Sequence, residues 1–96
     1  MLHTLHSSPF NGAAFTNCLR YAQPQSDILL LEDGVIAAIK NSVWQQQIKN
    51  TGLKIYALKE DLEARGLLEQ VAKNIKVIDI KGFISLTERH DKQLKW

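Results

Sequence analysis

The feature that most constrains this chain is an unbroken apolar stretch, Ile28 to Leu31, within the segment Asp27 to Ile39. Four successive apolar residues leave a strand without a polar face, so both of its faces must be covered, as they are inside a parallel sheet. After two carboxylates and a glycine, the five apolar residues Val35 to Ile39 predict a helix with almost no polar face. One side of that helix can cover the sheet, and the other needs a second layer or another chain.

Length and composition indicate one small globular domain, residues 1–96. A domain of 96 residues leaves much of its surface exposed, so its core is modest. Hydrophobic residues make up 45% of the chain and charged residues 23%, a balance typical of folded globular proteins. The net charge is +2, and the 12 basic residues are scattered between Arg20 and Lys95. Direct nucleic-acid binding is therefore not indicated.

The sequence has no pattern typical of export or of membrane insertion. Its longest apolar run is five residues, far below the roughly 20 that span a bilayer. Met1 to Phe10 has neither a basic start nor an apolar core of signal-peptide length. The single cysteine, Cys18, cannot form an intramolecular disulfide, which fits a reducing compartment. We therefore expect a cytoplasmic protein without a membrane contact.

The rest of the chain alternates between strand and helix patterns. Ser7, Ser8 and Pro9 predict a helix start, and that helix ends near Gln23 because Pro24 disfavours helical geometry in the residue before it. The other predicted strands are Met1 to Leu5, Leu53 to Leu58 and Lys76 to Ile80. The other predicted helical segments are a helix opened by a capping box of Ser42 and Gln45, two short pieces at Lys59 to Arg65 and Leu67 to Lys73, and a helix from Gly82 with Phe83, Leu86 and His90 on one face. The tail Asp91 to Trp96 is predicted to dock by its tryptophan.

This alternation predicts an α/β fold, a three-layer α/β/α domain with a mainly parallel sheet of four to five strands. Ligands of such sheets bind beyond the carboxyl ends of the strands. No glycine-rich phosphate-binding motif is present, so no nucleotide cofactor is expected. The side chains expected at the carboxyl edge are mostly acidic: His6, Ser7, Glu32, Asp33, Glu60, Asp61 and Lys81.

Three of these edge residues, His6, Asp33 and Asp61, are candidates for a metal site or for an acid and base pair if the fold brings them together. The alternative is that the carboxylates cap helix starts, where the helix dipole favours negative charge. We expect the second role and no bound metal, because polar loop residues collect at strand ends in any fold of this class. His3 and His90 lack a cysteine or histidine at metal-ligand spacing and are expected to be structural.

Cys18 is the only residue able to carry covalent sulfur chemistry. It shares an apolar helical stripe with Phe15 and Leu19, which predicts an inert core thiol, because reactive cysteines sit partly exposed in electropositive surroundings. A helix interior is also an unusual place for a nucleophile, which is expected in a loop after a strand or at a helix start. Trp44 and Trp96 are expected to be packing residues in preference to binding anchors.

Four segments of the chain together resemble one known family. MLHTLHSSPF, ILLLEDGVIAAI, IYALKEDLEARGL and FISLTERH with the terminal Trp96 are similar to the TusB/DsrH family of sulfur-relay proteins, and the likeness runs from the first residue to the last. Each segment is unspecific alone, and the resemblance rests on their order and spacing. It implies a small subunit of the DsrE/DsrF/DsrH type, assembled with the related chains TusC and TusD into a heterohexamer made of two trimers.

The resemblance also implies a task in sulfur transfer. In the TusB branch the complex passes persulfide sulfur from TusA toward TusE for 2-thiolation of the tRNA wobble uridine, and in the DsrH branch a related complex serves sulfur oxidation. The sulfur-carrying cysteine of the family lies in a loop of the TusD or DsrE type of subunit, whereas no loop of this chain holds a cysteine. DsrH-type members carry a first-helix cysteine at a place that matches Cys18, which leaves the branch open.

Three functional hypotheses follow. The first is a non-catalytic subunit that completes an interface through Val35, Ile36 and Ile39 and positions the sulfur-bearing cysteine of a partner. The second is a sulfur carrier in its own right, with Cys18 cycling between thiol and persulfide. The third is a small-ligand module at the acidic edge. The reactivity of the thiol distinguishes the first two hypotheses, since a working carrier is alkylated quickly at neutral pH.

Overall fold

The centre of the fold is a five-stranded, all-parallel sheet in a computed structural model that describes residues 1–96. The strands lie in the order β4-β3-β2-β1-β5. β2 is interior, with Ile28 opposite His3 of β1 and Ile55 of β3, as its apolar sequence predicts. The predicted α/β class and parallel sheet are confirmed. The bounds of the strands are β1 Leu2–Leu5, β2 Asp27–Leu30, β3 Lys54–Leu58, β4 Ile75–Ile78 and β5 Gln93–Lys95.

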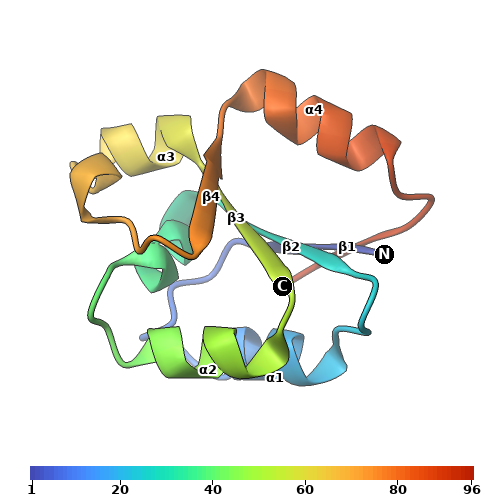
Figure 1. Ribbon diagram of the computed structural model, residues 1–96, viewed down its shortest axis with the longest axis horizontal. Coiled ribbons are helices and arrows are strands. Elements are labelled where there is room, and N and C mark those ends of the chain that lie inside the picture. The colour runs from blue at the N-terminus through green and yellow to red at the C-terminus, as the bar shows by residue number, and fades with distance from the viewer.

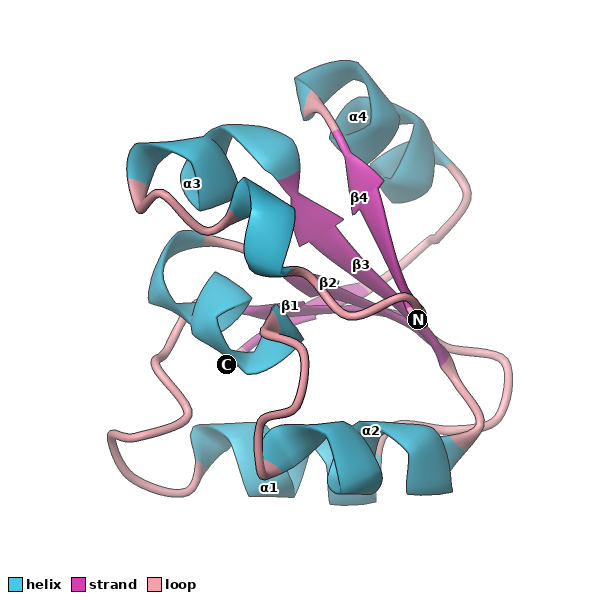
Figure 2. Ribbon diagram, turned by 60° about the vertical axis from the view of Figure 1, so that its left-hand side comes forward, coloured by secondary structure: helices cyan, strands magenta, loops and turns pink.

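Helices lie on both sides of this sheet and complete the three layers. The helix α1 (Ala14–Tyr21) and the helix α2 (Trp44–Thr51) run side by side on one side, and α4 (Ile80–Glu88) covers the other, as Figures 1 and 2 show. The shorter elements are the 3₁₀ segment η1 Glu32–Ala38 after β2, the helix α3 Lys59–Ala64 after β3 and the 3₁₀ segment η2 Leu68–Gln70 before β4. None of the helices combines the length and apolar character needed to cross a bilayer.

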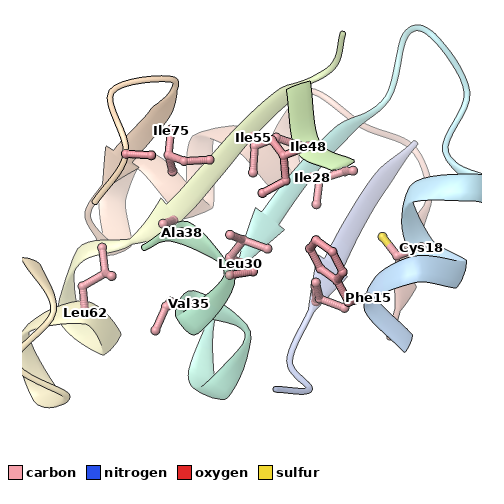
Figure 3. Close-up of a cluster of buried hydrophobic side chains, with 14 residues drawn as sticks. Phe15, Cys18, Ile28, Leu30, Val35, Ala38, Ile48, Ile55, Leu62 and Ile75 are labelled. Carbon is pink, nitrogen blue, oxygen red and sulfur yellow. The ribbon is translucent and has the colours of Figure 1, made fainter. Parts of the chain in front are cut away.

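Alternating side chains divide the core into two clusters. Ile28 and Leu30 of β2 belong to a cluster of 14 buried residues that also receives side chains from α1, α2, η1 and α3 (Figure 3). Leu29 and Leu31 belong to a cluster of six, which Leu86 of α4 completes. The central strand is apolar from Ile28 onward because each of its two faces supplies one of these clusters.

The first helix is shorter than predicted. It begins at Ala14, because the Ser8 hydroxyl accepts a hydrogen bond from the Phe10 backbone N–H at 3.2 Å and so closes a local turn instead of capping a helix. Gly12 then has a φ of +77°, which no right-handed helix accommodates. The helix ends at Tyr21, two residues before the predicted end.

The predicted capping box of Ser42 and Gln45 is wrong. The helix α2 begins at Trp44 without a side-chain cap. The Gln45 side-chain amide donates to the Ala37 carbonyl at 3.0 Å, and the Ser42 hydroxyl oxygen has no hydrogen-bond partner. The Gln45 side chain therefore bonds a carbonyl eight residues away in place of the helix start. A pattern of neighbouring residues does not reveal such a contact.

The last predicted strand and helix are displaced by one or two residues. The strand β4 begins at Ile75 and ends at Ile78, and α4 begins at Ile80 instead of Gly82. Asp79 causes this early start, because its carboxylate accepts a hydrogen bond from the Gly82 backbone N–H at 2.9 Å and caps the helix.

The C-terminal tail forms a strand that the sequence pattern did not predict. Leu94 in β5 lies opposite His3 of β1. The Trp96 backbone N–H donates to the Thr4 carbonyl at 2.8 Å, and the Trp96 carbonyl accepts from the His6 backbone N–H at 3.0 Å. The Trp96 side chain packs against the larger core cluster, as expected of a packing residue.

At its start, η1 crosses the carboxyl end of β1 at very short range. The Leu31 backbone N–H donates to the Leu5 carbonyl at 3.1 Å, and the Gly34 backbone N–H donates to the Leu31 carbonyl at 3.0 Å. Gly34 lies so close to the Leu5 carbonyl group that any side chain at this position would overlap it. Glu32 has a φ of +51°, a left-handed conformation that is unusual for a residue with a side chain.

Candidate functional site

The thiol of Cys18 lies inside the protein. Cys18 has no exposed surface, and Figure 3 shows it on α1 beside Phe15, facing the strands. Burial raises the pKa of the thiol to about 12. At neutral pH the sulfur is therefore protonated and shielded, whereas nucleophilic cysteines are accessible thiolates.

At the carboxyl edge of the sheet, the three residues considered for a metal site each contact a different group. His6 Nδ1 lies 3.3 Å from a carboxylate oxygen of Glu32, and Asp33 pairs with Arg65 at 2.9 Å. Asp61 accepts a hydrogen bond from the backbone N–H of Glu32. His6, Asp33 and Asp61 thus do not converge, and the structure contains no group of three or more potential metal ligands.

Two carboxylates of this edge cap helix starts, as the alternative interpretation predicts. Asp61 binds the first backbone N–H of η1, and Glu60 accepts a hydrogen bond from the Ile80 backbone N–H at the start of α4, at 3.3 Å. Negative charge is favoured at both places because the free N–H groups of a helix start carry partial positive charge.

The apolar run after β2 is mostly covered by the chain itself. It forms a 3₁₀ segment in place of the predicted helix, and Val35, Ala37 and Ala38 have no exposed surface. The prediction that Val35 lies at an interface is therefore wrong, because its side chain belongs to the larger core cluster. Ile36 and Ile39 are partly exposed and remain candidates for contact with a partner.

Larger exposed apolar side chains occur where the sequence did not indicate an interface. Phe10 is 74% exposed and meets the ring of Trp44 edge to face, with 4.8 Å between the ring centroids. Val43, beside Trp44, is 77% exposed, and on α4 Ile84 is 54% exposed. The sequence pattern predicts that Phe10 lies in the first helix, whereas the structure places it in the turn before Ala14.

At the amino edge of the sheet, the buried His3 and the partly buried His90 have structural partners, as expected for both. The Trp96 indole N–H donates to Nδ1 of His3 at 3.1 Å. His90 Nε2 lies 2.8 Å from Oδ2 of Asp27, and the Arg89 guanidinium donates to the same oxygen at 3.0 Å. The Asp27 side chain is only 9% exposed, so this carboxylate fastens the end of α4 to the start of β2.

Acid is expected to loosen the C-terminal strand through His3. Because Nδ1 accepts the indole hydrogen bond, His3 is neutral with its proton on Nε2. Burial, followed by the N-terminal charge and His90, lowers the pKa of His3 from 6.5. At pH values between the lowered pKa of folded His3 and the pKa of 6.5 in the unfolded chain, the unfolded chain binds more protons than the folded chain. The contribution of His3 to stability is therefore complete above pH 6.5 and is lost as the pH falls through the lowered pKa.

This prediction is checked by following the Trp96 indole N–H signal by NMR, together with the free energy of unfolding, from about pH 7.5 to about pH 5. His3→Gln is the control, because its neutral side chain does not titrate in this range. The variant should lose less stability on acidification than the parent. Equal losses in both chains would assign the pH dependence to other groups.

Comparison with known proteins agrees with this geometry. The family profile described as DsrH like protein matches residues 7–93. Protein TusB of Shigella sonnei is 44% identical to this chain and Protein TusB of Escherichia coli is 43% identical, each over 96 residues that cover 100% of both sequences. The chain belongs to the TusB/DsrH family. Membership in the TusB/DsrH family supports a role in a sulfur-relay system that serves tRNA thiolation.

Solved structures with low sequence identity to this chain have the same fold. The ychN protein of Escherichia coli superposes with a TM-score of 0.83 at 16% identity, covering 99% of this chain and 97% of that one. Protein Tm0979 of Thermotoga maritima superposes with a TM-score of 0.68 at 28% identity, covering 96% of this chain and 97% of that one. The likeness to ychN shows the fold alone.

Proposed function

We propose that this TusB/DsrH family chain is a non-catalytic subunit of a TusBCD-type complex, which passes persulfide sulfur from TusA toward TusE for 2-thiolation of the tRNA wobble uridine. Its direct partners are TusC-like and TusD-like chains in a cytoplasmic heterohexamer, and it contacts neither nucleic acid nor membrane. The observation that carries the proposal is the burial of Cys18, the chain's one thiol. Without a usable sulfur atom of its own, the chain serves the relay by supporting a cysteine on a partner.

The chemistry of persulfide transfer argues against Cys18 as the carrier. With a pKa of about 12, on the order of one thiol in 100,000 is ionised at pH 7. A persulfide also adds one sulfur atom to the side chain, and close-packed interiors do not accept an added atom without strain. A sulfur donor would reach this thiol only if α1 left the sheet. The hypothesis of an independent carrier, and with it a DsrH-type role that uses Cys18, therefore has less support.

The acidic carboxyl edge gives little support to the ligand-module hypothesis. Asp33 is held by Arg65, and Asp61 and Glu60 are held by backbone N–H groups. These carboxylates already have partners within the chain, so a ligand that used them would first have to displace internal hydrogen bonds.

Partly exposed apolar side chains after β2 supply the surface for assembly. We expect Ile36→Asp and Ile39→Asp each to weaken binding to the TusC-like and TusD-like partners by about tenfold or more, since a charge in an apolar contact must be desolvated. Folding should be affected less, because both side chains already touch water. Val35→Asp is the contrasting variant and should unfold the chain, because Val35 is fully buried.

Assembly is measured by co-purification with the two partners and by sedimentation, and folding by circular dichroism of the isolated chain. If Ile36→Asp and Ile39→Asp both assemble as the parent does, this segment is not part of the interface.

Cys18→Ala is expected to leave sulfur transfer nearly unchanged. It removes the sulfur without adding a polar group, whereas Cys18→Ser places a hydroxyl in the core and should cost about 1 to 3 kcal/mol of stability, less where the serine bonds back to a carbonyl one turn earlier. The measurement is 2-thiouridine in bulk tRNA from cells that lack the native subunit and carry each variant. If both variants accumulate and assemble but sulfur transfer is abolished, Cys18 is a carrier and the proposal is wrong.

A further inference from the structure

A surface hollow of about 510 Å³ lies between α2 and the segment that leads into β4. Gln45 and Lys49, four residues apart, line it from the same face of α2. The opposite wall is the segment 71–74, and Lys40 and Asn41 complete the lining. We call this hollow the lysine groove, and its lining residues are Lys40, Asn41, Gln45, Lys49, Val71, Ala72, Lys73 and Asn74.

One wall of the lysine groove, the segment with Val71 and Ala72, is joined by main-chain hydrogen bonds to the end of η1 and to Lys40. Ile39 and Val71 form an antiparallel bridge. The Ala72 backbone N–H donates to the Ala38 carbonyl at 2.9 Å, and the Lys40 backbone N–H donates to the Gln70 carbonyl at 2.7 Å. The Gln45 side chain donates to the Ala37 carbonyl and so ties α2 to the same segment. Both walls are therefore held against η1 in the free chain, which lowers the entropy cost of binding a ligand between them.

The charge of the lysine groove is positive and uncompensated. Lys40, Lys49 and Lys73 line it, and no acidic residue does. None of the three lysines takes part in an ion pair of the structure. The whole chain carries 12 basic and 10 acidic residues, so three lysines without an acid around one hollow are a local excess that attracts anions.

Gln45 adds a hydrogen-bond acceptor to this positive lining. The residue is only 7% exposed, and its side-chain N–H bond to the Ala37 carbonyl fixes which end of the amide is the oxygen. That oxygen, Oε1, finds no donor within the chain. Oε1 has almost no exposed surface, so a ligand N–H group meets it only after a small movement of the Gln45 side chain. The pairing then removes the cost of a buried acceptor without a donor.

We propose that the lysine groove binds an acidic polypeptide segment of a partner protein. Peptides supply both of the required groups, carboxylates for the lysines and backbone N–H groups for Gln45. Inorganic anions at neutral pH offer few or no donors, and the groove has neither the arginine fork nor the glycine-rich backbone typical of phosphate sites. It also lacks aromatic side chains on which bases of a single-stranded nucleic acid stack. The inference stands on the groove alone and goes beyond the proposed function.

The test is an NMR titration of the isotope-labelled full chain with a blocked hexaglutamate peptide at low salt. Backbone signals of residues 40–49 and 71–74 and the side-chain amide of Gln45 should shift, and a hexaglutamine peptide should leave them in place. Lys40→Gln combined with Lys73→Gln should weaken hexaglutamate binding about fivefold or more. Lys59→Gln combined with Lys95→Gln, which removes the same charge outside the groove, should weaken it less than twofold.

Each other outcome overturns the proposal. If hexaglutamate leaves the groove signals unshifted, or if both double variants weaken binding equally, no peptide site exists there. If sulfate shifts the same signals with comparable affinity, the groove is a simple anion site. If a hexauridylate strand binds there more tightly than hexaglutamate, the groove is a nucleic-acid site.

Discussion

Gly34→Ala is expected to lower the free energy of unfolding by about 3 kcal/mol or more, because it introduces a steric clash that cannot relax locally. An added Cβ would overlap the Leu5 carbonyl oxygen and lie 2.9 Å from the carbonyl carbon. Both atoms belong to the backbone of β1, so no side chain can rotate away. The clash would separate η1 from β1 and withdraw the fully buried Val35 from the core.

The measurement is chemical denaturation of the parent and of two glycine variants. Gly12→Ala is the matched control, because its Cβ meets nothing within 4 Å and its only penalty is the positive φ of +77°. That penalty should be about 1 kcal/mol. If Gly34→Ala costs no more than Gly12→Ala, the close approach of η1 to β1 is not a constraint on folding.

Asp27→Ala is expected to have the second largest effect, a loss of about 2 to 4 kcal/mol, because it leaves buried hydrogen-bonding groups without a partner. The side chains of Asp27 and His90 are 9% and 10% exposed, and they meet at 2.8 Å. Arg89 is 58% exposed, so its contact with the same carboxylate is screened by water and contributes little. Most of the loss should therefore come from His90.

The effect should be concentrated in α4, the one helix on its side of the sheet. Hydrogen exchange of the α4 amides is expected to accelerate in Asp27→Ala more than exchange in α1 or α2. Asp27→Asn is the control, since it keeps the size and an acceptor oxygen while removing the charge, and it should fall between the parent and the alanine variant. If the alanine variant unfolds as the parent does, Asp27 does not fasten α4 to the sheet.

The sheet was predictable because four successive apolar residues in and just after its central strand indicate burial on both faces. Ile28 to Leu31 has no polar face, and only an interior position in a parallel sheet covers two apolar faces. The strand β5 was not predictable in the same way. It has three residues of mixed character, and its stability comes from pairing with β1 at the far end of the chain, which a local pattern does not record.

For the candidate sites, too, features that depend on neighbouring residues were predictable, and features that depend on distant segments were not. The burial of Cys18 follows from its place on an apolar stripe, which depends only on neighbours along the helix. The ion pair of Asp33 with Arg65 and the grouping of Lys40, Lys49 and Lys73 depend on segments that meet only in the folded chain. The predicted exposure of Val35 is wrong because the pattern does not show how closely η1 lies against Leu5 of β1 and against α2.

The all-parallel pairing has a consequence for how the chain folds. Leu2 lies opposite Asp27 on one side and Gln93 on the other, and Asp27 lies opposite Lys54, so no strand pairs with a neighbour joined by a tight turn. Each strand pairing requires the chain to close a long loop, and the entropy of that closure is lost before the strand contacts form. Folding is therefore expected to be slower than that of a helical bundle of similar size. Until α4 docks, Leu29 of the central strand and Leu31 just after it face water. Partly folded chains are therefore prone to associate with one another through this side of the sheet.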